Sequence, residues 1–182
     1  MNPIDVLTRE HRLIERVLDC LDELASRTVR GAELDRAGAA SAIRFVRSFA
    51  DARHHAKEEE RLFPLLERKG VPRDGGPIGV MLHEHELGRE AVRRMDTALG
   101  AGESRAFCEH ARAYVELLRD HIGKEDDVLF RIAESILDEG ERAALLDEFT
   151  RFDGSDEQEA VLREATALAE QLERAYGAGT PA

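Results

Sequence analysis

The sequence predicts an all-α protein built as an up-down-up-down four-helix bundle with additional C-terminal helices. Three observations support this class. Helix-forming Ala, Leu, Glu and Arg dominate long stretches of the 182-residue chain. Apolar residues recur there every three or four positions, and no segment alternates as a β-strand does. Many of the 5 prolines and 14 glycines lie between these periodic segments, where they would end helices.

The first two helices have recognisable ends. The first is expected over residues 3–27, because Asn2 suits the N-cap position and Pro3 suits the first helical position. The second is expected over residues 33–69. Gly70 follows it and can adopt the left-handed conformation that closes a helix.

The third helix is expected over residues 77–100 and the fourth over residues 103–138. Four amphipathic helices joined by short or polar connections favour a bundle, which we assign to residues 1–139. The inward stripe of the fourth helix is expected to continue beyond Glu125 through Val128, Ile132 and Ile136.

Two more amphipathic helices are expected in residues 140–176, one over 141–152 and one opening at Ser155 with a capping box. They would pack on or beside the bundle, or present a surface for a protein partner or self-association. Residues 177–182 are expected to form a frayed tail.

Composition excludes several function classes. The 38 acidic and 26 basic residues leave a net charge of −12, so we expect no nucleic-acid partner. The 2 cysteines exclude a disulfide scaffold and a Cys-rich zinc site. No apolar run approaches the roughly 20 residues of a membrane span, and the N-terminus turns polar too early for a signal peptide. We therefore expect a cytoplasmic protein that does not contact a membrane.

Each bundle helix carries a histidine on its apolar stripe, where leucine would be expected. These four are His11, His54, His85 and His121. One such histidine is usually a core residue bonded to a backbone carbonyl, but four buried together need a common partner. Glutamates follow two of them by one helical turn, Glu58 in the second helix and Glu125 in the fourth. Because two buried carboxylates need a neutralising cation, the pattern predicts a metal centre.

Imidazole and carboxylate ligands without thiolate favour iron, manganese or zinc. His55 is rotated by about 100° from His54, so the two rings could reach different ions. With two bridging carboxylates and an oxo or hydroxo bridge, the set fills about eleven of the twelve positions of two octahedral ions. The open position suits a small ligand such as dioxygen.

Some neighbouring residues have other expected roles. Glu15, Glu59 and Asp126 are expected on a solvated face or as partners of a ligand ring N–H, although Asp126 could exchange roles with Glu125. His83 is expected to be exposed. His110 lies three turns from His121, roughly 16 Å away, and so falls outside the centre. A ferritin-like site is excluded, because no histidine has a glutamate three residues before it.

The segments that carry these residues are REHRLI, HHAKEEERLFP, LHEHELGR and DHIGKEDDVLF. Together they resemble the hemerythrin-like, or HHE cation-binding, family over about residues 3–138. The resemblance implies a four-helix bundle around a non-haem di-iron centre. By motif position it implies as ligands His11, His54, Glu58, His85, His121 and Glu125, with His55 added less directly.

The sequence departs from the oxygen-carrying members in two ways. Their third helix supplies two histidines four residues apart, but here Arg89 stands four residues after His85. His55 could supply the missing ligand. Their fourth helix has His-x-x-x-x-Asp spacing, whereas here Glu125 follows His121 at the shorter spacing, although Asp126 also stands at the longer one. These departures put reversible oxygen carriage in question.

Three functions follow as hypotheses. The first is a di-iron protein that binds dioxygen or a related small molecule, or senses oxygen or iron; manganese or zinc is less expected in the site. The second is an enzyme that uses the same centre on peroxide or nitric oxide. The third is a metal-dependent regulatory or interaction module whose C-terminal helices dock a partner.

Overall fold

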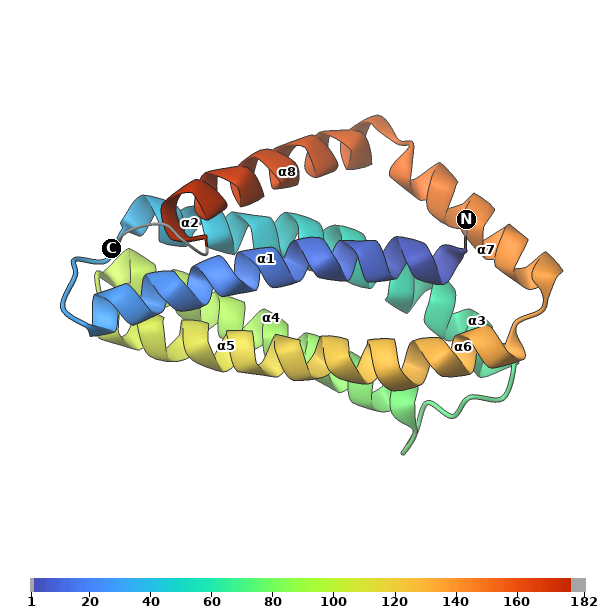
Figure 1. Cartoon of the computed structure of the whole chain (residues 1–182). Coiled ribbons are helices and arrows are strands. Elements are labelled where there is room, and N and C mark those ends of the chain that lie inside the picture. Colours follow the sequence, from blue (N-terminus) through green and yellow to red (C-terminus); the bar gives the residue numbers. More distant parts are fainter. Residues whose placement is uncertain (1, 178–182) are drawn as a thin grey trace.

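The computed structural model describes residues 2–177, and every regular element in that range is a helix. Four antiparallel rods lie side by side, and two further helices arch over one side of them (Figure 1). The predicted all-α bundle with additional C-terminal helices is confirmed. In the predicted tail at 177–182, positions 178–182 lie outside the described residues.

The first and third rods are single helices, α1 (Pro3–Val29) and α4 (Pro77–Ala101). The other two rods are composite and contain π-helical turns, labelled η. The second rod consists of α2 (Arg36–Phe45), η1 (Val46–His55), η2 (Glu58–Leu62) and α3 (Phe63–Arg68). The fourth rod consists of α5 (Ser104–Lys124), η3 (Glu125–Leu129) and α6 (Phe130–Ile136).

Local capping explains where the rods begin. Asn2 caps α1 in a capping box, and α8 begins directly after its cap, Ser155. The second rod starts at Arg36, later than expected, because the Asp35 side chain accepts hydrogen bonds from two backbone N–H groups of the first turn. Gly70 follows that rod with a φ of 91°, the left-handed conformation expected of it.

The π-helical turns change which side chains face the core. Each such turn inserts an extra residue into the helical ladder, so the inward face shifts after it. In the fourth rod Val128 is 50% exposed, whereas Leu129 is buried. Ile132 and Ile136 are only half-buried. The predicted stripe is therefore wrong at Val128, because it assumed an uninterrupted α-helix, and Ile132 and Ile136 pack only as partly buried neighbours of the core.

A polar layer divides the apolar core into two clusters. On α1, Leu7 belongs to one cluster and Ile14 to the other, with His11 between them. His85 divides α4 in the same way. The histidine layer is therefore enclosed by apolar packing on both sides.

The last two helices, α7 (Glu139–Asp153) and α8 (Asp156–Tyr176), are here called the C-terminal extension. In Figure 1 these two helices form the arch over the bundle. Helix α8 packs against α1, α2 and η1, and α7 contacts α1 and η2. Apolar side chains of α8 such as Leu168 and Leu172 are buried there. No helix among the described residues combines the length and apolar character that a bilayer crossing requires.

Candidate metal centre

The seven predicted ligand side chains meet in the polar layer, and none is more than 5% exposed. They come from all four rods: His11 (α1), His54 and His55 (η1), Glu58 (η2), His85 (α4), His121 (α5) and Glu125 (η3). The structure thus brings together every side chain that the sequence singled out for the site.

These side chains form two adjoining groups. In each group, one nitrogen or oxygen atom per residue lies within 4.8 Å of those of the other members. One group contains His55, His85 and His121; the other contains His11, His54, Glu58 and Glu125. His54 and His55, neighbours in sequence, fall into different groups.

Four imidazole Nε2 atoms face the two glutamates. The distances are 3.2 Å from His11 to Glu125, 3.3 Å from His54 to Glu58, 3.6 Å from His85 to Glu58 and 3.2 Å from His121 to Glu125. Each glutamate is therefore approached by two rings on different rods. His55 joins the set differently, because its ring stacks on His85 with centroids 3.7 Å apart.

The polar atoms at the centre are better suited to binding metal ions than to forming hydrogen bonds with one another. Both carboxylate oxygens of Glu58 and of Glu125 are buried and have no hydrogen-bond partner among the described residues. The same holds for Nε2 of His11 and Nδ1 of His55. Such atoms are unfavourable in a dry core, whereas two divalent cations would bind the glutamate oxygens and His11 Nε2. Nδ1 of His55 instead lies 3.5 Å from the Asp51 carboxylate. The donor set fits iron, manganese or zinc.

The pKa values of the buried groups at the centre also favour a bound cation. Burial, reinforced by the neighbouring Glu125 carboxylate, raises the pKa of Glu58 well above its ordinary value. Burial would lower the pKa of His11, but Asp126 and Glu125 outweigh it and raise that pKa to about 9. Without a cation the centre therefore holds protons, which metal binding displaces.

A second ring of carboxylates surrounds the histidines. Each of these outer carboxylates, as we call them, accepts a hydrogen bond from the Nδ1 atom of one histidine. The pairs are Glu10 with His54 at 3.0 Å, Glu59 with His85 at 2.6 Å, Glu84 with His121 at 3.0 Å and Asp126 with His11 at 2.8 Å. Since a carboxylate only accepts, Nδ1 carries a proton, and Nε2 is the nitrogen that a metal ion would bind.

The ring closes around the bundle. Each outer carboxylate is adjacent in sequence to a proposed ligand on its own rod, and it bonds a histidine on the next rod. Glu10 of α1 reaches the second rod, Glu59 reaches α4, Glu84 reaches the fourth rod, and Asp126 returns to α1. The orientation of every ring thus depends on the packing of two rods.

A cation pairs with each outer carboxylate in turn. Lys57 binds Glu10, Arg89 binds Glu59 at 2.6 Å, Lys124 binds Glu84 and Arg12 binds Asp126. These pairs keep the carboxylates ionised. Burial alone would raise the pKa values of the four outer carboxylates, but the paired histidines and cations lower them. The pKa of Glu10 falls to about 2.

Sequence reasoning found half of this ring. Of the three acidic residues predicted on a solvated face or as partners of a ring N–H, Glu59 and Asp126 bond a ring, whereas Glu15 pairs with Arg12 at 2.9 Å. Because Asp126 bonds the outer nitrogen of His11, it is not among the side chains that face the centre. Glu10 and Glu84 were missed. The available signal was their position directly before His11 and His85.

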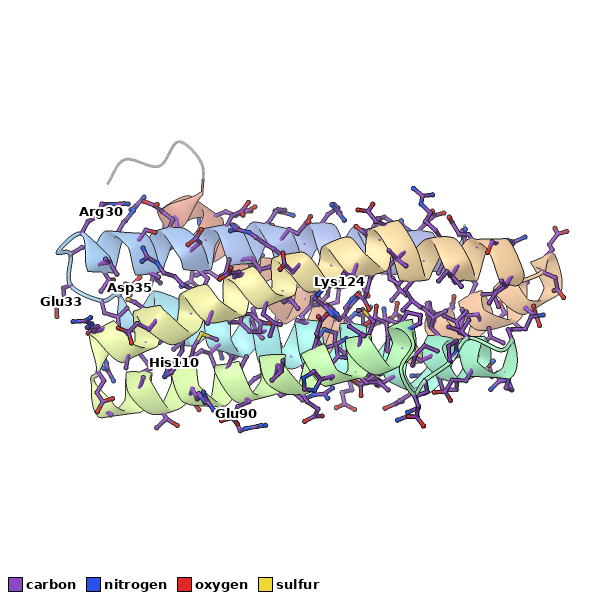
Figure 2. All side chains as sticks on the ribbon, turned by 90° about the horizontal axis from the view of Figure 1, so that it is seen from below. Arg30, Glu33, Asp35, Glu90, His110 and Lys124 are labelled. Carbon is purple, nitrogen blue, oxygen red and sulfur yellow. The ribbon has the colours of Figure 1, made fainter. Side chains whose placement is uncertain are left out.

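Arg89 does not point toward the centre. Its guanidinium binds Asp51 at 2.7 Å and Glu59 at 2.6 Å. His83 is exposed, as expected, and half-buried His110 lies far along α5 from Lys124 (Figure 2). Neither histidine belongs to the two groups.

A pocket of about 260 Å³ opens beside the three-histidine group. Its lining includes His55 and His85 together with apolar side chains from η1, α4 and α5. Gly88 of α4 lines the pocket and has no side chain to occupy it. A Cβ atom at this position would contact only the Tyr114 ring, at 3.6 Å. A small molecule can therefore approach this group of histidines from outside.

Comparison with known proteins gives a consistent result. The hemerythrin HHE cation-binding domain matches residues 2–133. The iron–sulfur cluster repair protein DnrN of Neisseria gonorrhoeae is 36% identical over 92 residues, covering 45% of this chain and 58% of that protein. Uncharacterised proteins Mb2018 of Mycobacterium bovis and Rv1995 of Mycobacterium tuberculosis are 28% identical over 143 residues, covering 72% of this chain and 53% of each relative. The chain thus spans little more than half the length of these relatives. No solved structure matches it.

The matched residues run from α1 into α6 and include all seven side chains of the two groups. The C-terminal extension lies beyond the match. A metal cofactor, typically iron, is a property of this family, and it agrees with the unpartnered donors of the polar layer. The resemblance seen in the sequence is confirmed, and the chain belongs to the hemerythrin HHE cation-binding domain family.

Proposed function

We propose that this chain is a non-haem di-iron protein that binds dioxygen or a related small molecule, or senses oxygen or iron, at the polar layer. One observation carries the proposal: Glu58 and Glu125, whose carboxylate oxygens have no hydrogen bonds among the described residues, lie within 3.6 Å of Nε2 atoms from all four rods. His55, His85 and His121 would hold one ion. His11 and His54 would hold the other, with Glu58 and Glu125 between the two.

The surrounding residues have defined tasks in this proposal. The outer carboxylates hold the histidine protons on Nδ1, so that the inner nitrogens are free to bind. The two apolar clusters exclude bulk water, and the pocket beside Gly88 admits the ligand. When bound, iron supplies a coordination position and electrons for the small molecule.

The experiment is anaerobic loading with Fe(II) followed by exposure to air. We expect a ligand-to-iron absorption band in the near-ultraviolet or visible range that His121→Ala lacks while remaining helical. A wild-type protein that retains iron but stays colourless in air would contradict dioxygen binding.

A second candidate is an enzyme that acts on peroxide or nitric oxide at the same centre. The pocket beside the three-histidine group has room for either molecule. The similarity to a protein named for iron–sulfur cluster repair favours a role in iron chemistry. Sustained turnover by the loaded protein, above that of free iron, distinguishes this candidate from simple binding.

Gly88→Leu should block ligand access without removing the ions. The leucine would occupy the pocket, so azide should bind to the iron-loaded protein more slowly. Gly100→Leu is the matched control, since Gly100 lies on the same helix with nothing within 4 Å of an added Cβ. Equal rates of azide binding in the two variants, at equal iron content, would show that ligands enter elsewhere.

A further inference from the structure

One of the four cations that bind the outer carboxylates differs from the rest. The side chains of Arg12, Arg89 and Lys124 are 51%, 25% and 46% exposed, and Lys124 lies on the bundle surface in Figure 2. The Lys57 side chain is 0% exposed. A fully buried ammonium group requires complete pairing within the protein, so its surroundings must be fixed by structure rather than by solvent.

The C-terminal extension supplies that pairing. Besides binding Glu10, the Lys57 ammonium donates to the two carboxylate oxygens of Asp153 at 3.1 and 3.2 Å. Buried Arg53 also binds Asp153, at 2.9 Å, and donates to the backbone carbonyl of Gln158 at 3.0 Å. Asp153 ends α7 and Gln158 lies in the first turn of α8, so both halves of the extension take part.

The charges in this cluster balance: two cations, Lys57 and Arg53, face two carboxylates, Glu10 and Asp153. Arg53 Nε also lies 3.5 Å from Glu10. If Asp153 were neutral, both buried cations would be left with Glu10 as their only carboxylate. They would then pull Glu10 from the position in which it accepts the His54 hydrogen bond.

We propose that Asp153 is a positioning residue for the metal centre: through Lys57 and Glu10 it orients His54, and so couples docking of the C-terminal extension to metal binding. This inference rests on the proposed metal centre. The coupling is selective. The outer carboxylates that orient His85 and His121 pair with Arg89 and Lys124, and the ion pairs of these two cations do not involve the extension. Only the ion held by His11 and His54 should respond.

The coupling also runs in the opposite direction. Since docking of the extension strengthens metal binding, metal binding must strengthen docking by the same factor. A groove of about 620 Å³ lies against this cluster and is lined by Glu10, Arg53 and Asp153. Water can therefore reach the cluster when the extension loosens.

Asp153→Asn tests the inference, because it removes the charge with little change in shape. In anaerobic Fe(II) titrations against a chromogenic chelator, we expect the affinity for one ion to fall by roughly ten- to a hundredfold, while that for the other stays unchanged. Asp147→Asn is the matched control, since Asp147 is an exposed residue of the same helix. Asp153→Glu should restore most of the lost affinity.

Hydrogen exchange gives the second readout. In the wild type, Fe(II) should slow amide exchange in α7 and α8, and in Asp153→Asn it should not. Equal affinities for both ions in wild type and Asp153→Asn would overturn the coupling while leaving the metal centre intact. A wild type that binds no ion would overturn the metal centre, and the coupling with it.

Discussion

Fe(II) added to the metal-free protein under anaerobic conditions should raise its melting temperature by roughly 15 to 30 °C. Free iron at about 1,000 times the dissociation constant stabilises by about 4 kcal/mol per ion, and each kcal/mol moves the melting temperature of a chain of this size by about 2–4 °C. The physical reason is the polar layer, where unpartnered glutamate oxygens separate the two apolar clusters. Circular dichroism at 222 nm measures the shift.

Calcium is the control cation, because it prefers six to eight oxygen ligands and suits the histidine-rich layer poorly. We expect it to move the melting temperature by only a few degrees. A shift with calcium as large as with Fe(II) would mean that surface acidity, rather than the polar layer, binds the cations.

Glu58→Gln should change stability in opposite directions in the metal-free and the loaded protein. In the metal-free protein at neutral pH it should raise the free energy of unfolding by about 1–3 kcal/mol, since a buried carboxyl group that is ionised in the unfolded chain becomes an amide that is neutral in both states. In the loaded protein it should remove a bridging ligand, so that Fe(II) gives less than half the wild-type shift. Urea unfolding with and without Fe(II) measures both effects.

The gain in the metal-free protein has a predicted pH dependence. The pKa of Glu58 is raised in the folded state, so the folded protein retains a proton there that the unfolded chain releases above pH 4.5. The contribution of Glu58 to wild-type stability therefore falls as pH rises above 4.5, and the advantage of Glu58→Gln should vanish below that pH. Glu116→Gln, an exposed substitution with the same charge change, should show neither effect. A Glu58→Gln variant that is destabilised in the metal-free state would contradict this account of the buried carboxylates.

The inward histidines were predictable because each interrupts an apolar stripe. His11 and His85, for example, stand between residues of the two apolar clusters, and a helical period alone reveals that position. The same reasoning failed at Val128, because the extra residue of a π-helical turn leaves no mark in the spacing of apolar residues.

The outer ring was only partly predictable for a different reason. Whether Glu10 bonds His54 or faces solvent depends on how α1 is rotated against the second rod, and spacing within one helix does not contain that information. The buried pairing of Lys57 with Asp153 depends in addition on where the C-terminal extension folds back. On each rod, one proposed ligand has an adjacent acidic residue that bonds a histidine of the next rod, and this is the pattern that the structure adds to the sequence motif.

The metal content of the protein as purified, without added metal, tests the central claim most directly. Elemental analysis should find two iron ions per chain in the wild type and fewer in Glu125→Gln. One ion or none in the wild type, or equal iron in both proteins, would contradict a di-iron centre built from these side chains.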